Sequence, residues 1–123
     1  MARKMQIKWL SKPKAGNYPA AVSYLSLIYK PKEAARIVQR LRQASVAQFK
    51  SKDIFRASGL PLQGVSNFFV ERDRHRILEG EALSPILLVR DPVHGRVVVA
   101  DGYHRLCSVY AMDAEAPIPC KIV

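Results

Sequence analysis

The sequence predicts an α+β fold in which a small mixed sheet with helices is preceded by a helical N-terminal extension. Three observations predict this class. Residues 19–60 carry apolar side chains at the three-and-four spacing of helices. Residues 85–100 contain two runs of apolar residues joined by Pro-Val-His-Gly, which is typical of a hairpin. A helical pattern at 102–112 separates this hairpin from a closing apolar run at 118–123, so helices and strands are interleaved.

The N-terminal half contains three expected helices that follow a basic arm. Residues 1–18 show little periodicity and are expected to be partly extended, with Trp9 pinning this arm to the body. The first helix starts at Pro19 and the second at Pro31, because proline suits the first turn of a helix. A shorter third helix covers 46–58 and stops at a following glycine. The second helix has a core-facing stripe, formed by Ala34, Ile37, Val38, Leu41 and Ala44.

The C-terminal half is predicted to contain most of the sheet. Residues 68–70 are expected to be a short strand and residues 71–83 a helix. The strands at 85–91 and 96–100 are joined by a tight turn, so we expect them to be antiparallel. A parallel crossover from the second of these strands to the strand at 118–123 is an alternative that stays open. The length predicts one domain at 1–123, with an arm at 1–18, a helical extension at 19–60 and a core at 67–123.

The net charge of +10 is the strongest signal in the composition. Residues 1–56 hold 13 Lys and Arg against two acids, whereas residues 57–123 hold 7 against 8. A basic half favours a nucleic acid, another polyanion or an acidic protein surface as partner, with a solvated face as the structural alternative. If the partner is a nucleic acid, the expected contacts to its backbone are Arg36, Arg40 and Arg42, together with the lysines of the arm.

The sequence predicts a cytoplasmic protein without a membrane partner. No run approaches the roughly eighteen apolar residues that a membrane span needs. The basic start of the chain lacks the apolar core of a secretory signal. Because Cys107 and Cys120 lack CxxC spacing, we expect them to be two buried free thiols in this compartment.

A predicted strand runs directly into a predicted helix at one junction, whose five residues are Asp101, Gly102, Tyr103, His104 and Arg105. Asp101 suits a helix cap, and Gly102 allows a sharp turn. The first backbone N–H groups of a helix have no partner within it, so they form an anion site that His104 and Arg105 would complete. We therefore predict that the junction binds phosphate. The alternative is a capped turn in which Arg105 pairs with Asp101 or Asp113.

Residues 70–123 resemble the ParB/sulfiredoxin-like domain. The resemblance rests on a helix, the strand SPILLV, a hairpin, the Asp-Gly-x-His-Arg motif that opens a helix, and the closing strand IPCKIV, in this order. In that family the junction binds nucleotide phosphates. The resemblance therefore implies that Gly102, His104 and Arg105 contact phosphate, with Asp101 as a cap or as a carboxylate on the metal side.

Two departures from the family limit what the resemblance implies about activity. Sulfiredoxin has its catalytic cysteine directly before the His-Arg pair, where this chain has Tyr103, and Cys107 lies a full turn further on. Sulfinic acid reductase activity is therefore not expected. ParB partition proteins add a second arginine-rich phosphate motif and a helix-turn-helix domain, which this sequence does not show, so DNA binding of the centromere type is not expected.

The sequence leaves open whether the site performs chemistry. Nucleotide hydrolysis, phosphoryl transfer or a nuclease reaction would need a divalent ion such as Mg²⁺, because the metal offsets charge that develops on phosphate oxygens. The expected cofactor is a nucleotide with Mg²⁺, and no haem, flavin or zinc is expected, since no histidine and cysteine set has zinc-ligand spacing. The competing function is a non-enzymatic nucleic-acid-binding or adaptor module that uses the basic half.

The run ERDRHR at 71–76 fits two interpretations. Its alternating charge indicates a salt-bridged, exposed helix, and a phosphate contact from Arg74 or Arg76 is the alternative. The candidate acids for metal binding or proton transfer are Glu71, Asp73, Glu79 and Glu81. Their spacing fits a solvated helix face equally well.

Overall fold

The computed structural model describes residues 6–62 and 67–123, which form five α-helices, one 3₁₀ turn and four strands. The helices are α1 (Asn17–Leu25), α2 (Pro31–Gln43), α3 (Ser51–Ser58), α4 (Phe68–Leu78) and α5 (Tyr103–Met112). The strands are β1 (Ala47–Lys50), β2 (Ile86–Asp91), β3 (Arg96–Asp101) and β4 (Pro117–Ile122), and the 3₁₀ turn η1 (Pro92–His94) joins β2 to β3. The predicted α+β class is confirmed. None of these helices combines the length and the apolar character that crossing a membrane requires.

The four strands form one mixed sheet in the order β1-β4-β2-β3. The pairs β2–β3 and β1–β4 are antiparallel, whereas β2 and β4 are parallel. The predicted hairpin and the small mixed sheet are therefore confirmed. A parallel crossover from β3 to β4 is wrong, because β2 lies between these two strands and they run in opposite directions. The parallel pair is formed by β2 and β4, and α5 carries the chain across the sheet between β3 and β4.

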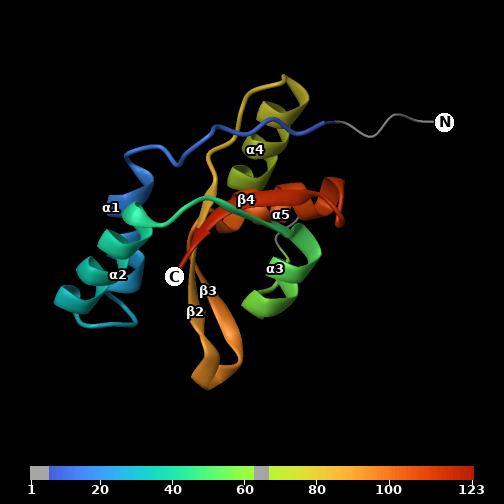
Figure 1. Cartoon of the computed structure of the whole chain (residues 1–123). Coiled ribbons are helices and arrows are strands. Elements are labelled where there is room, and N and C mark those ends of the chain that lie inside the picture. The colour runs from blue at the N-terminus through green and yellow to red at the C-terminus, as the bar shows by residue number, and fades with distance from the viewer. Residues whose placement is uncertain (1–5, 63–66) are drawn as a thin grey trace.

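Helices cover both faces of the sheet, with α1 and α2 on one side and α3, α4 and α5 on the other (Figure 1). Successive residues of a strand point to opposite faces. Val98 of β3 accordingly joins the core cluster that contains Leu25 of α1 and Leu41 of α2. Val97 joins the second cluster, with Ile54 of α3 and further residues of α4 and α5. The second cluster places α5 beside α3 and α4.

Residues 47–50 form a strand where the sequence predicts a helix over 46–58. β1 pairs with β4 in antiparallel register, with Phe49 opposite Ile118, and α3 starts only at Ser51. The prediction fails because the hydrogen-bonding partner of β1 lies far along the chain. Pairing with the free edge of β4 overrides the local helical pattern, and periodicity within the segment carries no information about that edge.

Residues 68–70 form the first turn of α4, where the sequence predicts a short strand. Asn67 caps this helix, because its side-chain oxygen accepts hydrogen bonds from the N–H of Phe69 at 2.9 Å and of Val70 at 3.3 Å. The cap overrides the strand propensity of the aromatic pair. α4 then ends at Leu78, earlier than expected.

Part of the basic arm pairs with the segment before β2. The N–H of Leu10 donates to the Leu83 carbonyl at 2.8 Å, and the N–H of Leu83 donates to the Lys8 carbonyl at 2.9 Å. Between these bonds, Trp9 packs against the core cluster that contains Leu83. The predicted pinning of the arm by Trp9 is confirmed.

Candidate functional site

The predicted junction lies where β3 meets α5, and Gly102 is its turning point. Gly102 is the N-terminal cap residue of α5 and has a φ of 103°, which residues with a Cβ rarely adopt. The expected cap by Asp101 is wrong. Its carboxylate instead accepts a hydrogen bond from Nη2 of Arg105 at 3.0 Å, because the helix starts one residue later than the cap requires. This confirms the Arg105–Asp101 pairing of the alternative interpretation.

Gly102 also packs closely against β2. A Cβ at this position would lie 2.4 Å from Cγ2 of Ile86 and 2.8 Å from Nη2 of Arg105. Both distances are far below the optimal contact distance between non-bonded heavy atoms. The chain therefore needs glycine here for space as well as for conformation, and this close approach fixes the first turn of α5 against the sheet.

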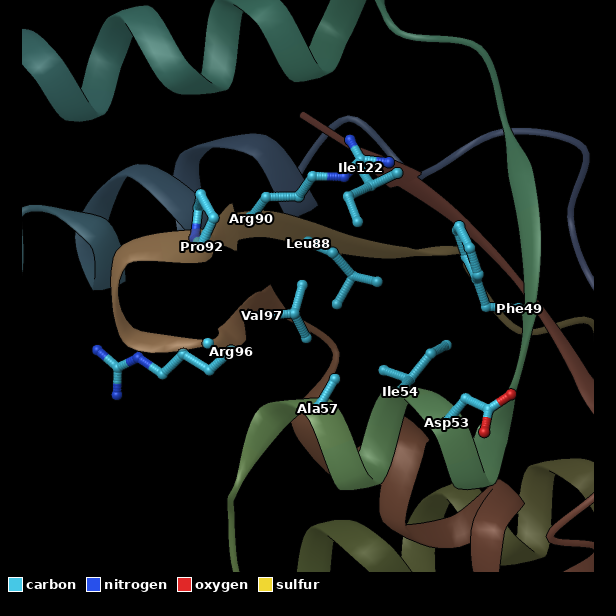
Figure 2. Close-up of a pocket in the computed structure, with 11 residues that line it drawn as sticks. Phe49, Asp53, Ile54, Ala57, Leu88, Arg90, Pro92, Arg96, Val97 and Ile122 are labelled. Carbon is cyan, nitrogen blue, oxygen red and sulfur yellow. The ribbon is translucent and has the colours of Figure 1, made fainter.

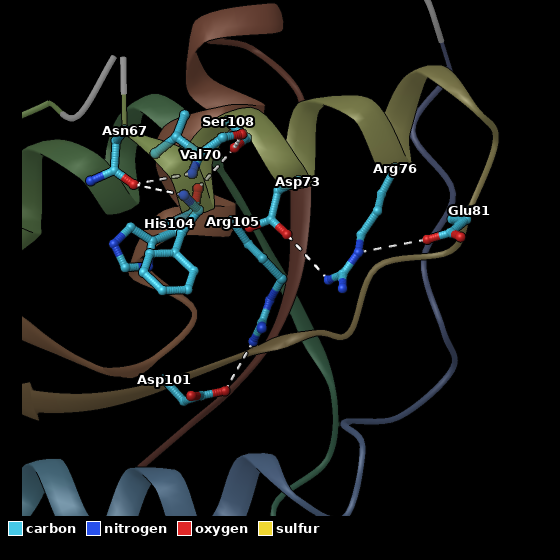
Figure 3. A network of polar contacts seen from close by, with 10 residues as sticks. Asn67, Val70, Asp73, Arg76, Glu81, Asp101, His104, Arg105 and Ser108 are labelled. Carbon is cyan, nitrogen blue, oxygen red and sulfur yellow. Dashed lines mark hydrogen bonds and ion pairs between the residues drawn. The ribbon is translucent and has the colours of Figure 1, made fainter. Parts of the chain in front are cut away.

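Side chains on two sides hold the N-terminal half of α5 in place. The His104 ring stacks on Phe69 of α4, with ring centroids 5.0 Å apart. The buried Ser108 hydroxyl donates to the Val70 carbonyl at 2.8 Å (Figure 3). The Tyr103 hydroxyl donates to the carbonyl of Pro61, in the segment after α3. The start of α5 is therefore pre-organised.

Two cavities open beside the N-terminus of α5. The larger, of about 510 Å³, is lined by Asp101, Gly102, Tyr103 and His104, together with residues of α1. The smaller, of about 280 Å³, is lined by Arg105 and by residues of α4 and the arm. The structure thus brings all five predicted phosphate-binding residues to cavity walls, but it places Arg105 in a different cavity from the other four.

The smaller cavity is strongly basic. Its charged lining residues are Lys14, Arg72, Arg76, Arg105 and Glu81. Arg72 and Arg76 are four residues apart and therefore project from the same face of α4. The sequence pattern indicates Arg76 as a candidate phosphate contact but misses Arg72. The four-residue spacing of Arg72 and Arg76 is the signal that could have identified it.

A buried carboxylate lies among these arginines. Asp73 is 2% exposed, and its Oδ1 lies 3.4 Å from Nη1 of Arg76 (Figure 3). Burial raises the pKa of the Asp73 carboxyl, and the neighbouring arginines offset only part of this effect. The Asp73 carboxylate thus contacts Arg76 directly and interacts with Arg105 and Arg72 through its charge.

Arg105 has unused capacity for hydrogen bonding. Its Nη2 donates to Asp101, whereas its Nε is buried and has no acceptor in the part of the chain that the structure describes. A guanidinium carries five N–H donors, and a buried donor without an acceptor costs about 1 to 3 kcal/mol. An anion that reached this guanidinium would find donors available.

Three of the four candidate acids on α4 and just after it pair with cations. Glu71 pairs with Arg74 at 3.1 Å and with His75 at 3.2 Å, so the expected salt-bridged face is confirmed here. Glu81 pairs with another arginine of α4, and Glu79 is exposed. Among the described residues, no three His, Cys, Asp or Glu side chains are placed to hold a metal ion.

The three arginines predicted to contact nucleic acid lie on α2 and do not share one face. Arg36 and Arg40 are exposed and one helical turn apart. Arg42 instead places its guanidinium 4.4 Å from the centre of the Tyr18 ring. A row of cations therefore runs through Arg36 and Arg40 without Arg42.

The two cysteines are buried and free, as predicted. Cys107 lies within α5 and is 0% exposed, so it does not reach the cavities at the start of that helix. Burial raises the pKa of the Cys120 thiol to about 11, which keeps it protonated and unreactive near neutral pH.

The close approach of Gly102 to Ile86 predicts that one added methyl group at position 102 strongly lowers the stability of the fold. Gly102→Ala should lower the free energy of unfolding by at least about 2 kcal/mol, from backbone strain and overpacking together. Gly16→Ala is the matched control, since φ there is −68° and a Cβ would meet no atom within 4 Å. Urea unfolding of the two variants measures the difference, and equal effects would show that Gly102 is not constrained.

The buried Asp73 predicts a specific pH dependence of stability. Because its pKa is raised in the folded state, the protonated form favours folding, and this contribution is lost as pH rises from about 4 through the folded pKa. Asp73→Asn should therefore gain stability relative to the wild type between pH 4 and pH 7. Urea unfolding across this range measures the gain, with exposed Asp53→Asn as control. Parallel pH profiles of the Asp73→Asn variant and the wild type would contradict the burial effect.

Comparison with protein-family models, with curated proteins and with solved structures found no match for this chain. The similarity to the ParB/sulfiredoxin-like domain therefore stays a prediction, which rests on the junction motif and the two strands that accompany it. The geometry of the site stands independently of that similarity: a fixed helix N-terminus, a cluster of arginines, and two cavities lined by the first residues of α5.

Proposed function

We propose that the protein binds a nucleotide or another phosphorylated ligand at the N-terminus of α5. The observation that carries this proposal is the convergence of Arg72, Arg76 and Arg105 on one cavity at the start of that helix. Helix N-termini and clustered arginines attract the same kind of ligand, a compact anion with several acceptor oxygens. A phosphate group has this chemistry.

Arg105 takes the central contact in this proposal. Figure 3 shows its side chain reaching from α5 to Asp101, with Arg76 approaching from α4. The hydrogen bond to Asp101 fixes the guanidinium plane, which leaves its remaining donors for ligand oxygens. A pre-oriented guanidinium can form two parallel hydrogen bonds to phosphate.

The larger cavity supplies room for the nucleoside part of a nucleotide. The rings of Tyr24, Tyr103 and His104 contribute to its lining, next to Leu60 and Pro61. Nucleobases bind to aromatic side chains by stacking. In this proposal the base lies in the larger cavity, which His104 lines, and the phosphates lie in the smaller cavity, which Arg105 lines.

The carboxylates beside the arginines do not fit a metal site belonging to the protein. Asp73 and Glu81 both pair with Arg76, so their oxygens face cations. A nucleotide carries Mg²⁺ on its own phosphates. The proposal is for binding of the ligand, with any Mg²⁺ held by the ligand's own phosphates.

A thermal-shift panel of nucleoside mono-, di- and triphosphates, with and without Mg²⁺, tests the proposal. We expect one class to raise the melting temperature, since a ligand present at 100 times its Kd stabilises the native state by about 2.7 kcal/mol. Arg72→Gln and Arg105→Lys should each weaken binding by about tenfold, through loss of a charged or bidentate contact.

The matched control for this panel is Arg36→Gln, which removes the same charge from the exposed face of α2. Its melting-temperature shift should equal that of the wild type. The proposal fails if no phosphorylated ligand shifts the melting temperature, or if Arg72→Gln and Arg105→Lys respond as the control does.

A second candidate function is non-enzymatic binding of nucleic acid. One observation favours it: Lys32, Arg36 and Arg40 are exposed and follow one another at intervals of four residues along α2. Such a row lies on one side of the helix, where it can contact successive phosphates of a backbone.

Titration of a short DNA duplex at several salt concentrations tests this second function. The logarithm of the affinity should fall linearly with that of the salt concentration. Changing Arg36 and Arg40 together to Gln should reduce the slope of log affinity against log salt concentration by about 2. Changing Arg90 and Arg96 together to Gln removes the same charge and should leave this slope unchanged. An affinity that is independent of salt would exclude a phosphate-backbone interaction.

A further inference from the structure

An apolar groove of about 410 Å³ lies between α3 and the β2–β3 hairpin. Figure 2 shows Leu88 and Val97 of the hairpin facing Ile54 and Ala57 of α3 across this space. Among the described residues, the groove shares none of its lining with the two cavities beside the N-terminus of α5. It is therefore separate from the proposed phosphate site.

The groove exists because α3 is too short to cover its face of the sheet. α3 has 8 residues and ends at Ser58, whereas the hairpin extends beyond it (Figure 1). Phe49 of β1 is left 39% exposed at the groove. A concave, mostly apolar surface with a few polar groups has the composition of a small-molecule site, and its volume lies within the usual range.

Arg90 adds a cation to this apolar lining. It alternates with Leu88 along β2 and therefore lies on the same face of the sheet. Figure 2 shows its side chain running toward Ile122. No carboxylate of the described residues lies within ion-pair distance of Arg90, whereas the second arginine of the lining, Arg96, pairs with Asp91 at 3.0 Å.

We propose that this groove binds a small amphipathic monocarboxylate, whose apolar body lies on Leu88, Val97 and Ile54 and whose carboxylate pairs with Arg90. The apolar lining favours the body by removing it from water, and Arg90 offers charge-assisted hydrogen bonds to the head group. Asp53 of α3 also lines the groove and repels a second carboxylate. The groove should therefore discriminate against a dicarboxylate of the same length.

The charge of the chain favours this occupant over a second copy of the protein. Each copy carries a formal charge of +10, so two copies repel each other. If a second copy filled the groove, Arg90 would need an acidic partner from that copy. The chain has 20 Lys and Arg but only 10 Asp and Glu, so such a partner is scarce. An anion from outside the chain meets no such cost.

Isothermal titration of the full chain with decanoate, below its micelle concentration, tests the proposal. We expect one saturable site per chain, with decanedioate and decylamine binding at least about tenfold more weakly. Ala57→Trp fills the groove from an exposed position on α3 and should abolish binding. Arg90→Gln should weaken binding about threefold to fivefold, the value of a partly exposed ion pair.

Two control variants separate this groove from the remaining cationic surface. Arg36→Gln removes the same charge as Arg90→Gln, and Arg105→Lys alters the proposed phosphate site. Both should bind decanoate as the wild type does. Absence of saturable binding, unchanged binding by Ala57→Trp, or equal affinity for decylamine would overturn the proposal. Loss of decanoate binding in Arg105→Lys would place decanoate at the start of α5 and not in the groove. If the wild type sediments as a dimer and Ala57→Trp as a monomer, the groove is an interface with a second copy.

Discussion

The parallel pairing of β4 with β2 is the constraint on which the remaining structure depends. Three residues of each strand form this ladder, from Ile86 opposite Cys120 to Leu88 opposite Ile122. Parallel neighbours need a crossover connection, and β3 has already left β2 in the opposite direction, so a helix has to return the chain across the sheet. α5 is that helix. Its first turn therefore follows β3 and lies directly over β2, where Gly102 meets Ile86.

α4 completes the arrangement that this crossover starts. It contacts α5 through the Phe69–His104 stack and through the Ser108 hydroxyl, and so brings its own arginines to the start of α5. Cations gathered in this way repel one another, and the buried Asp73 offsets part of that repulsion at the cost of its own desolvation. Asp101 and Glu81 offset further positive charge, because they pair with Arg105 and Arg76. In the proposed function, a bound phosphate would add negative charge to the same cluster.

The sequence predicts those features whose signals are local. Pro31 marks the start of α2, and the hairpin and the Asp-Gly junction are placed correctly, because each depends on a few adjacent residues. β1 is missed because its partner strand lies far along the chain, and the first turn of α4 is missed because one capping asparagine overrides an aromatic run. At the site, the motif locates the helix N-terminus, but the separation of His104 from Arg105 depends on how α4 packs, which periodicity does not encode.

β1 closes the sheet on one side, and among the described strands nothing pairs with its outer edge. An open edge of this kind is the usual starting point for edge-to-edge aggregation. β1 is only four residues long, and the chain turns into α3 immediately after Lys50. An intruding strand would therefore gain few hydrogen bonds before it met the helix. The abrupt turn from β1 into α3 thus limits the growth of fibrils from this edge.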